Sequence, residues 1–200
     1  MRRPVRSRHR ALCLPLAAVL ACAGGRAPSA SSSSSPASRP AGAPARITRV
    51  ADANTAAILL TSHNAGLAAA RIATTRARHR DVKLLARSIV TDHTSMSASL
   101  ARLVAGINLT PREDDVSRLL RDQSAARRDT LRGLSGWRFD SAYVEHEVRF
   151  HQELLVAIDR VFLPSARNAS LREYVTTLRP TIASHLTLAE QARAVIAELR

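Results

Sequence analysis

From residue 47 onward, apolar residues recur every three or four positions, and no segment alternates apolar and polar residues as a half-buried strand would. This spacing predicts an all-α domain. The predicted helices run from about 50 to 78, from 82 to 107, from 110 to 133, from 140 to 162, and from 170 onward. Because the connections are short, residues 49–200 should form an antiparallel bundle of four long helices plus a shorter one.

Polar residues that can accept hydrogen bonds from free helix amides mark where the helices should begin. The predicted N-caps are Asp81, Thr110, Asp140 and Ser170. Thr110 is the strongest signal, because Pro111 suits the first helical position and Glu113 can reach back to the cap. Pro164 should end the fourth helix, and Pro180 should kink the last helix or restart it.

Three of the predicted helices carry a histidine at the centre of their apolar stripe: His93 in the second, His151 in the fourth and His185 in the last. The fourth helix also carries Glu147, one turn before His151, within the stretch FDSAYVEHEVRFHQ of residues 139–152. Burying an ionisable group costs free energy unless it is paired. These positions are therefore candidates for chemistry.

Metal sites in helical bundles are built from carboxylate and histidine side chains that project inward from facing helices. The candidate ligands are His93, Glu147, His151 and His185. Glu147 and His151 stand four residues apart, so both can reach a common ion. Imidazole and carboxylate ligands suit several transition metals, and the hypothesis is a single ion of iron, manganese or zinc.

A buried histidine is also commonly a core residue that one or two hydrogen bonds satisfy. Asp92, Tyr143 and Tyr174 are suitable partners, so a hydrogen-bonded network without a metal is the alternative. Histidines that fall off the stripes or at helix ends are predicted to lie on the solvated surface: His63, His79 and His146.

The N-terminus has the features of a secretory signal. Five arginines in the first ten residues precede the uncharged apolar run ALCLPLAAVLACA, residues 11–23. A helix of 13 residues rises only about 20 Å, which is less than the ~30 Å hydrocarbon core of a bilayer. Residues 1–22 are therefore predicted to direct export and not to span the membrane.

The end of this signal fits two kinds of processing. VLAC, residues 19–22, resembles a lipobox, in which Cys22 becomes the lipidated first residue of a membrane-anchored lipoprotein. The small residues Ala21 and Ala23 on either side of it fit ordinary signal cleavage equally well. In either case Cys13 leaves with the signal, so the mature chain has no intramolecular disulfide.

Residues 23–48 are rich in Ala, Ser, Pro and Gly, which predicts a disordered linker between the anchor and the bundle. The net charge of the chain is +14, and loss of the five signal arginines lowers it to +9. The arginines are scattered and aromatics make up only 3% of the chain, so nucleic acid is not an expected partner. The expected partner is the membrane, through an anchor at Cys22, and attraction to anionic lipid or polysaccharide stays open.

Three segments resemble, in the order of their landmarks, the bacterial domain-of-unknown-function 4142 family: RDVKLLARSIVTDHTSMSASLARL (80–103), GWRFDSAYVEHEVRFHQ (136–152) and LRPTIASHLTLAEQA (178–192). The positions that carry the resemblance are Asp92, His93, Phe139, Asp140, Tyr143, His151, His185 and Leu186. The resemblance implies a ferritin-like bundle exported to the cell envelope, in the periplasm or at the outer membrane. It implies no established activity.

The first helix departs from that family's pattern, which usually has a glutamate before a Leu-Ala pair. GLAAARIA, residues 66–73, offers no carboxylate on its inner face. A ferritin-type two-metal centre draws carboxylates from four helices, so a single ion or none is expected here.

The expected function is a non-enzymatic, membrane-tethered domain of the bacterial cell envelope that binds one metal ion in its core. Two alternatives stay open: a metal-dependent redox enzyme that uses the His/Glu cluster, and a purely structural or adaptor protein. The sequence has no Ser-His-Asp order, Gly-rich phosphate loop or cysteine pair that would point to another catalytic class.

Overall fold

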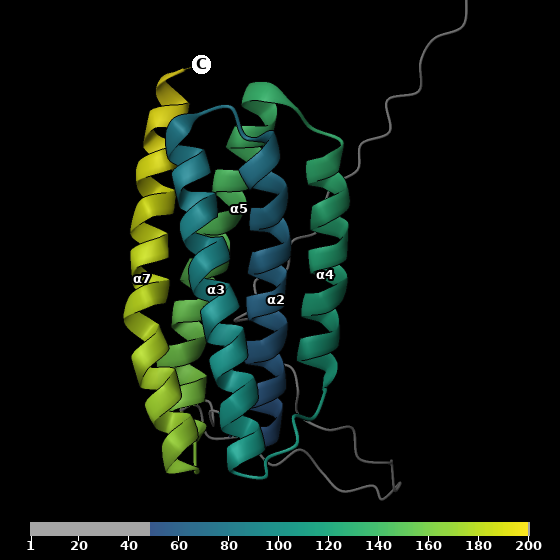
Figure 1. The fold of residues 1–200 in the computed structure, drawn as a ribbon, viewed down its shortest axis with the longest axis vertical. Coiled ribbons are helices and arrows are strands. Elements are labelled where there is room, and N and C mark those ends of the chain that lie inside the picture. Colours follow the sequence, from purple (N-terminus) through teal and green to yellow (C-terminus); the bar gives the residue numbers. More distant parts are fainter. Residues whose placement is uncertain (1–48, 200) are drawn as a thin grey trace, which may run out of the picture.

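The computed structural model describes residues 49–199, and five main helices make up most of this range (Figure 1). They are α2 (Asp52–Arg76), α3 (Arg80–Gly106), α4 (Asp115–Arg132), α5 (Gly136–Ala157) and α7 (Ala169–Glu198). A π-helical turn, η1 (Ile158–Phe162), and the short α6 (Leu163–Ser165) connect α5 to α7. No strand occurs within residues 49–199, which confirms the predicted all-α class. The predicted signal at 1–22, the lipidated Cys22 and the linker at 23–48 lie outside the described residues.

Four helices form the bundle, and the fifth covers one of them from outside. Within the bundle, α2 packs against α3, α3 against α7, α7 against α5, and α5 against α2. Helix α4, the shortest of the five, packs on the outer side of α2 (Figure 1). Neighbouring bundle helices run in opposite directions, so the predicted antiparallel bundle of four long helices plus a shorter one is confirmed. Among the described residues, no helix has the length and apolar character that a membrane span needs.

The start of α4 differs from the prediction. Its N-cap is Asp114, and not Thr110. The Ser117 amide donates to the Asp114 carboxylate (2.9 Å), and the Asp114 amide donates to the Ser117 hydroxyl (2.9 Å), which is a reciprocal capping box. Glu113 pairs with Arg121 instead of reaching back, so Thr110 has no capping partner and the helix starts four residues later.

The predicted caps of α3 and α5 are also wrong. The cap of α3 is His79, whose ring accepts from the Asp81 amide (3.2 Å). Asp140 lies inside α5, which starts at Gly136 with a positive φ of 59°. The buried Asp140 carboxylate accepts from the amides of Arg78 (3.1 Å) and His79 (2.8 Å), so it anchors the connection between α2 and α3. Its role is a tertiary one that local sequence cannot reveal.

The start of α7 is capped by Asn168, which accepts from the Leu171 amide (3.1 Å), and not by Ser170 as predicted. Pro164 lies in α6, just before the chain leaves the helix, close to the predicted stop. Pro180 does not restart α7, which runs without interruption from Ala169 to Glu198. Pro180 is exposed, so water can satisfy the carbonyl that lacks its helical partner.

The buried apolar side chains form two clusters, one toward each end of the bundle. The first cluster includes Leu59, Leu100, Leu154 and Ile182. The second cluster includes Leu85, Ile89, Phe139 and Ala189. On all four bundle helices, the residues between these clusters include buried polar side chains, which we call the polar layer: His63, His93, Glu147, His151 and His185. The fold therefore encloses a polar band within an apolar core.

Candidate metal centre

Each of the four bundle helices contributes one histidine to the polar layer. His63 comes from α2, His93 from α3, His151 from α5 and His185 from α7, and each is at most 1% exposed. The ring of His93 lies near the other three, with centroid distances of 5.4 Å to His63, 5.8 Å to His151 and 5.4 Å to His185. The three histidines predicted from the apolar stripes therefore lie at the same depth of the bundle.

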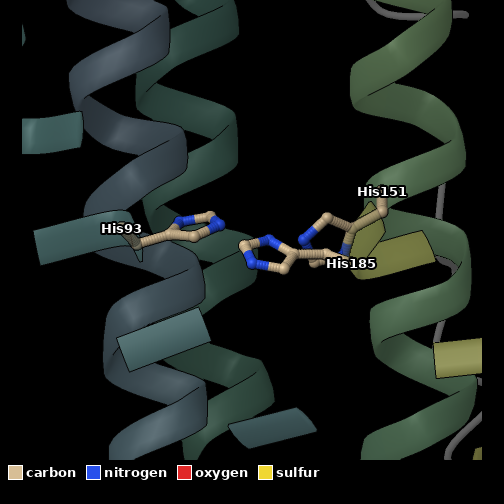
Figure 2. Close-up of side chains that lie close together, drawn as sticks. All are labelled: His93, His151 and His185. Carbon is tan, nitrogen blue, oxygen red and sulfur yellow. The ribbon is translucent and has the colours of Figure 1, made fainter. Parts of the chain in front are cut away.

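Three of these rings converge closely enough to hold a metal ion. One ring nitrogen from each of His93, His151 and His185 lies within 4.8 Å of the other two. Figure 2 shows the three side chains turned toward one another from their separate helices. Nitrogens bound to one tetrahedral ion at about 2.0 Å stand roughly 3.3 Å apart, so small side-chain rotations would bring the rings to bonding distance.

The second nitrogen of each of these rings meets an oxygen that can only accept a hydrogen bond. The acceptors are the His63 carbonyl for His93 Nδ1 (3.3 Å), the Glu147 carbonyl for His151 Nδ1 (2.9 Å) and the Asp92 carboxylate for His185 Nε2 (2.8 Å). Each of these nitrogens must therefore carry the hydrogen of a neutral ring. The tautomer of all three rings is fixed by their neighbours.

The remaining nitrogens then carry bare lone pairs: His93 Nε2, His151 Nε2 and His185 Nδ1. All three are buried, and none has a hydrogen-bond partner among the described residues. Burial lowers the pKa of His151 to about 3 and that of His93 well below its usual value. Burial also lowers the pKa of His185, against the opposing effect of Asp92. The rings are therefore neutral near pH 7, as metal binding requires.

His63 was predicted to lie on the surface, and the structure corrects this. It is fully buried, and its Nε2 lies 2.8 Å from the hydroxyl of Tyr174. That hydroxyl donates its one hydrogen to the Met96 carbonyl (3.0 Å), so His63 Nε2 donates to the phenol oxygen. Its Nδ1 is a fourth buried lone pair without a partner in the described part of the chain. Burial lowers the pKa of His63 to about 4.

Glycine at position 66 makes room for the layer. A Cβ on Gly66 would lie 2.7 Å from Cε1 and 2.8 Å from Nδ1 of His93, closer than side-chain atoms can approach. The His93 ring therefore packs directly on the backbone of α2. In place of a carboxylate on its inner face, α2 supplies His63 and the space that the His93 ring fills.

Glu147 lies beside the three-histidine group and does not belong to it. Its Oε2 is 3.4 Å from His151 Nδ1, the nitrogen that already carries hydrogen. Burial raises the pKa of Glu147 to about 8, against the opposing effects of the Tyr143 hydroxyl and Arg127. A carboxyl group at this place is suited to orienting His151, while the free lone pair of the ring is on Nε2.

The two other histidines predicted to be solvated have structural roles. His79 caps α3, and its ring also lies 3.9 Å from the Asp81 carboxylate. His146 is half-buried, and its ring packs 5.7 Å from that of Phe150. Burial lowers the pKa of His146 to about 3. Both residues lie outside the three-histidine group.

Comparison with known proteins gives one match. No curated protein and no solved structure matches the chain significantly. A family model described as "Domain of unknown function (DUF4142)" matches residues 36–192, which is well over half of the chain. This range contains the whole polar layer and the spaced residues on which the resemblance was based. The chain therefore belongs to the DUF4142 family.

Proposed function

We propose that this domain binds one transition-metal ion through His93, His151 and His185, and that it does so as an exported protein of the bacterial cell envelope. One observation carries the metal site: His93, His151 and His185 each bring a ring nitrogen within 4.8 Å of the other two, and each ring has a buried nitrogen without a partner in the described structure. A cation is the species that three converging lone pairs can satisfy together.

A hydrogen-bonded network explains the same group less well. Such a network pairs donors with acceptors, whereas here each of the three rings donates its N–H to an oxygen and keeps a buried acceptor nitrogen without a partner in the described structure. Leaving a buried acceptor unsatisfied costs about 1–3 kcal/mol. A trapped water has two hydrogens, so it could donate to two of the three lone pairs at most.

The surroundings of the rings match those of metal-binding histidines. Ligand histidines usually donate their other ring N–H to a carbonyl or carboxylate, which fixes the ring and raises its basicity. All three rings have such a partner. Three imidazoles leave a further coordination position open and suit zinc, iron or manganese.

The proposal is for binding and not for turnover. The three ligand residues are at most 1% exposed, so a substrate larger than an ion has no direct route to the centre. Storage or delivery of a metal ion in the envelope, or a structural ion, fits this burial better than the metal-dependent redox enzyme or the metal-free adaptor.

Reconstitution tests the metal site directly. We would purify the protein without chelator or affinity histidines and load it anaerobically with Fe(II), Mn(II) or Zn(II). About one ion per chain is expected, and it should be lost in His93→Ala, His151→Ala and His185→Ala. The controls are His79→Ala and His146→Ala, which remove histidines outside the group and should retain the ion. Absence of a stoichiometric ion would contradict the proposal.

Export and tethering are proposed from the N-terminus. The arginine-rich start, the short apolar run and the VLAC sequence support a lipoprotein signal, and residues 23–48 suit a tether between membrane and domain. Cys22→Ala should move the protein from the membrane fraction of cells to the soluble fraction. Unchanged membrane association would show that Cys22 is not the anchor.

A further inference from the structure

The three ligand histidines differ in what holds them. His93 and His151 donate to backbone carbonyls inside α2 and α5, which cannot turn without breaking a helix. His185 donates to a side chain, the carboxylate of Asp92 on α3 (2.8 Å). A side chain can rotate on a far shorter timescale than a helix can open. His185 is therefore the ligand whose support can move while the fold stays intact.

The three supports also differ in their exposure. His63 and Glu147, whose carbonyls hold the first two rings, are 0% exposed, whereas the side chain of Asp92 is 38% exposed. Ser88, one turn earlier on α3, donates to the same Asp92 oxygen (3.3 Å) and orients the carboxylate. Of the three residues that accept a hydrogen bond from a ligand ring, Asp92 is the one that is in contact with solvent.

We propose that the Asp92 carboxylate is an outer docking site that captures a divalent cation at the surface and passes it to His185. This inference rests on the proposed metal binding by the three histidines. The captured ion replaces the His185 N–H as the partner of the carboxylate, which frees the His185 ring to turn and take the ion from Asp92. The Asp92 carboxylate, without the ion, then accepts again from the His185 N–H and restores the observed arrangement.

Electrostatics favours capture at this place. The chain carries a net charge of +14, or +9 without the signal arginines, so the protein as a whole repels cations. A carboxylate at the point of access counters that repulsion locally and raises the rate at which cations arrive. Hard divalent cations also prefer oxygen ligands at a first, partly hydrated encounter.

A second partly exposed residue that contacts the layer, Tyr174, does not provide an equivalent site. Tyr174 is partly exposed and contacts His63, but its hydroxyl is neutral and bonded to the Met96 carbonyl. It offers a cation no charge. It also leads to His63, which lies outside the three-histidine group.

Uptake kinetics test the proposal. Co(II) would be mixed with the metal-free protein in a stopped-flow instrument, and its visible absorption would report arrival in the three-histidine centre. Asp92→Asn keeps an oxygen that can accept from His185 but removes the charge. We expect the association rate constant to fall roughly tenfold at low salt and to lose the decrease with rising salt that marks an attractive, steered encounter. The stoichiometry at saturating Co(II) should be that of the unsubstituted protein, because all three ligand histidines are present.

A matched substitution separates local capture from total charge. Glu190→Gln removes the same charge from α7, where the carboxylate lies on the α5 side, 3.4 Å from Gln152 Nε2. This variant should take up Co(II) as fast as the unsubstituted protein. Asp92→Glu, which keeps the charge, should also stay within about twofold of it.

Three results would overturn the docking site. Asp92→Asn that takes up Co(II) at the normal rate, and only releases it faster, would mean that Asp92 positions His185 without capturing ions. Equal slowing in Glu190→Gln would assign the effect to total charge. If the unsubstituted protein bound no Co(II), both proposals would fail, whereas the first two results leave the metal centre standing.

Discussion

The apolar clusters and the polar layer between them are buried to the same degree but built on opposite principles. In the clusters, side chains such as Leu154 and Phe139 are 0% exposed and are satisfied by packing alone. In the polar layer, lone pairs on four histidines lack a partner within the described residues. Buried polar atoms are normally paired, so a group of exceptions in an otherwise regular core points to function. The clusters stabilise the fold, and under the proposed function the layer gives up stability for a metal site.

The largest effect on stability should come from the clusters. Leu154→Ala leaves a cavity in the first cluster and should lower the free energy of unfolding by about 2–5 kcal/mol. Denaturant unfolding of the metal-free protein measures this. Because Leu154 lies outside the layer, the folded variant should still bind about one ion.

Denaturant unfolding of a variant in the polar layer should show no loss of stability. His151→Leu replaces a buried ring whose Nε2 has no partner in the described structure with an apolar side chain of similar size, so the metal-free protein should be as stable as before or more stable. The ion should be lost. A fall in stability as large as that of Leu154→Ala would mean that the layer is a satisfied hydrogen-bonded network. It would contradict the proposed difference between the apolar clusters and the polar layer.

A smaller effect is expected at Gly66. An added Cβ would collide with the His93 ring, and such overpacking costs about 1–3 kcal/mol, offset by up to ~1 kcal/mol of better helix propensity. Metal affinity should fall because His93 is displaced. The control is Gly106→Ala, where a Cβ meets nothing within 4 Å and should leave both properties unchanged. Normal metal binding in Gly66→Ala would mean that the position of His93 is not critical.

The smallest effect concerns pH. Glu147 has a pKa of about 8 in the fold and of about 4.5 when unfolded, so between these values unfolding releases its proton and stability falls as pH rises. The buried histidines have depressed pKa values, so they lower stability only below about pH 6.5. Between pH 6.5 and 8 the metal-free protein should therefore lose about 1–2 kcal/mol.

Glu147→Gln should remove that loss, because the amide does not titrate. Exposed Glu145 provides the control, and Glu145→Gln should keep the dependence on pH. Chemical unfolding at pH 6.5, 7.2 and 8 distinguishes the two variants. If Glu147→Gln lost stability over this range as the unsubstituted protein does, another group would have to be the source.

The sequence predicted three of the four layer histidines because α3, α5 and α7 each bury one stripe of large apolar residues. It missed His63 because α2 is covered by α3 on one side and by α4 on the other, so its alanines and leucines surround the helix and define no single face. His63 then stands out only as the polar residue four positions after the buried Leu59.

Helix caps and depth in the bundle were harder to predict. The Asp140 carboxylate bonds to amides of the connection between α2 and α3, a tertiary contact that resembles a local cap in sequence. Likewise, the common depth of His93, His151 and His185 depends on where α3, α5 and α7 start, and all three starts differ from the predicted caps. A sequence pattern predicts which face of a helix is buried. Packing determines how far each helix is shifted along its axis relative to its neighbours.

The most direct test of the account is the X-ray absorption spectrum of the zinc-loaded protein. It should show about three imidazole nitrogens around the metal at roughly 2.0 Å, with one further light ligand, and His185→Ala should lose this shell. A first shell made mainly of carboxylate oxygens, or one unchanged by His185→Ala, would place the ion elsewhere and contradict a three-histidine centre.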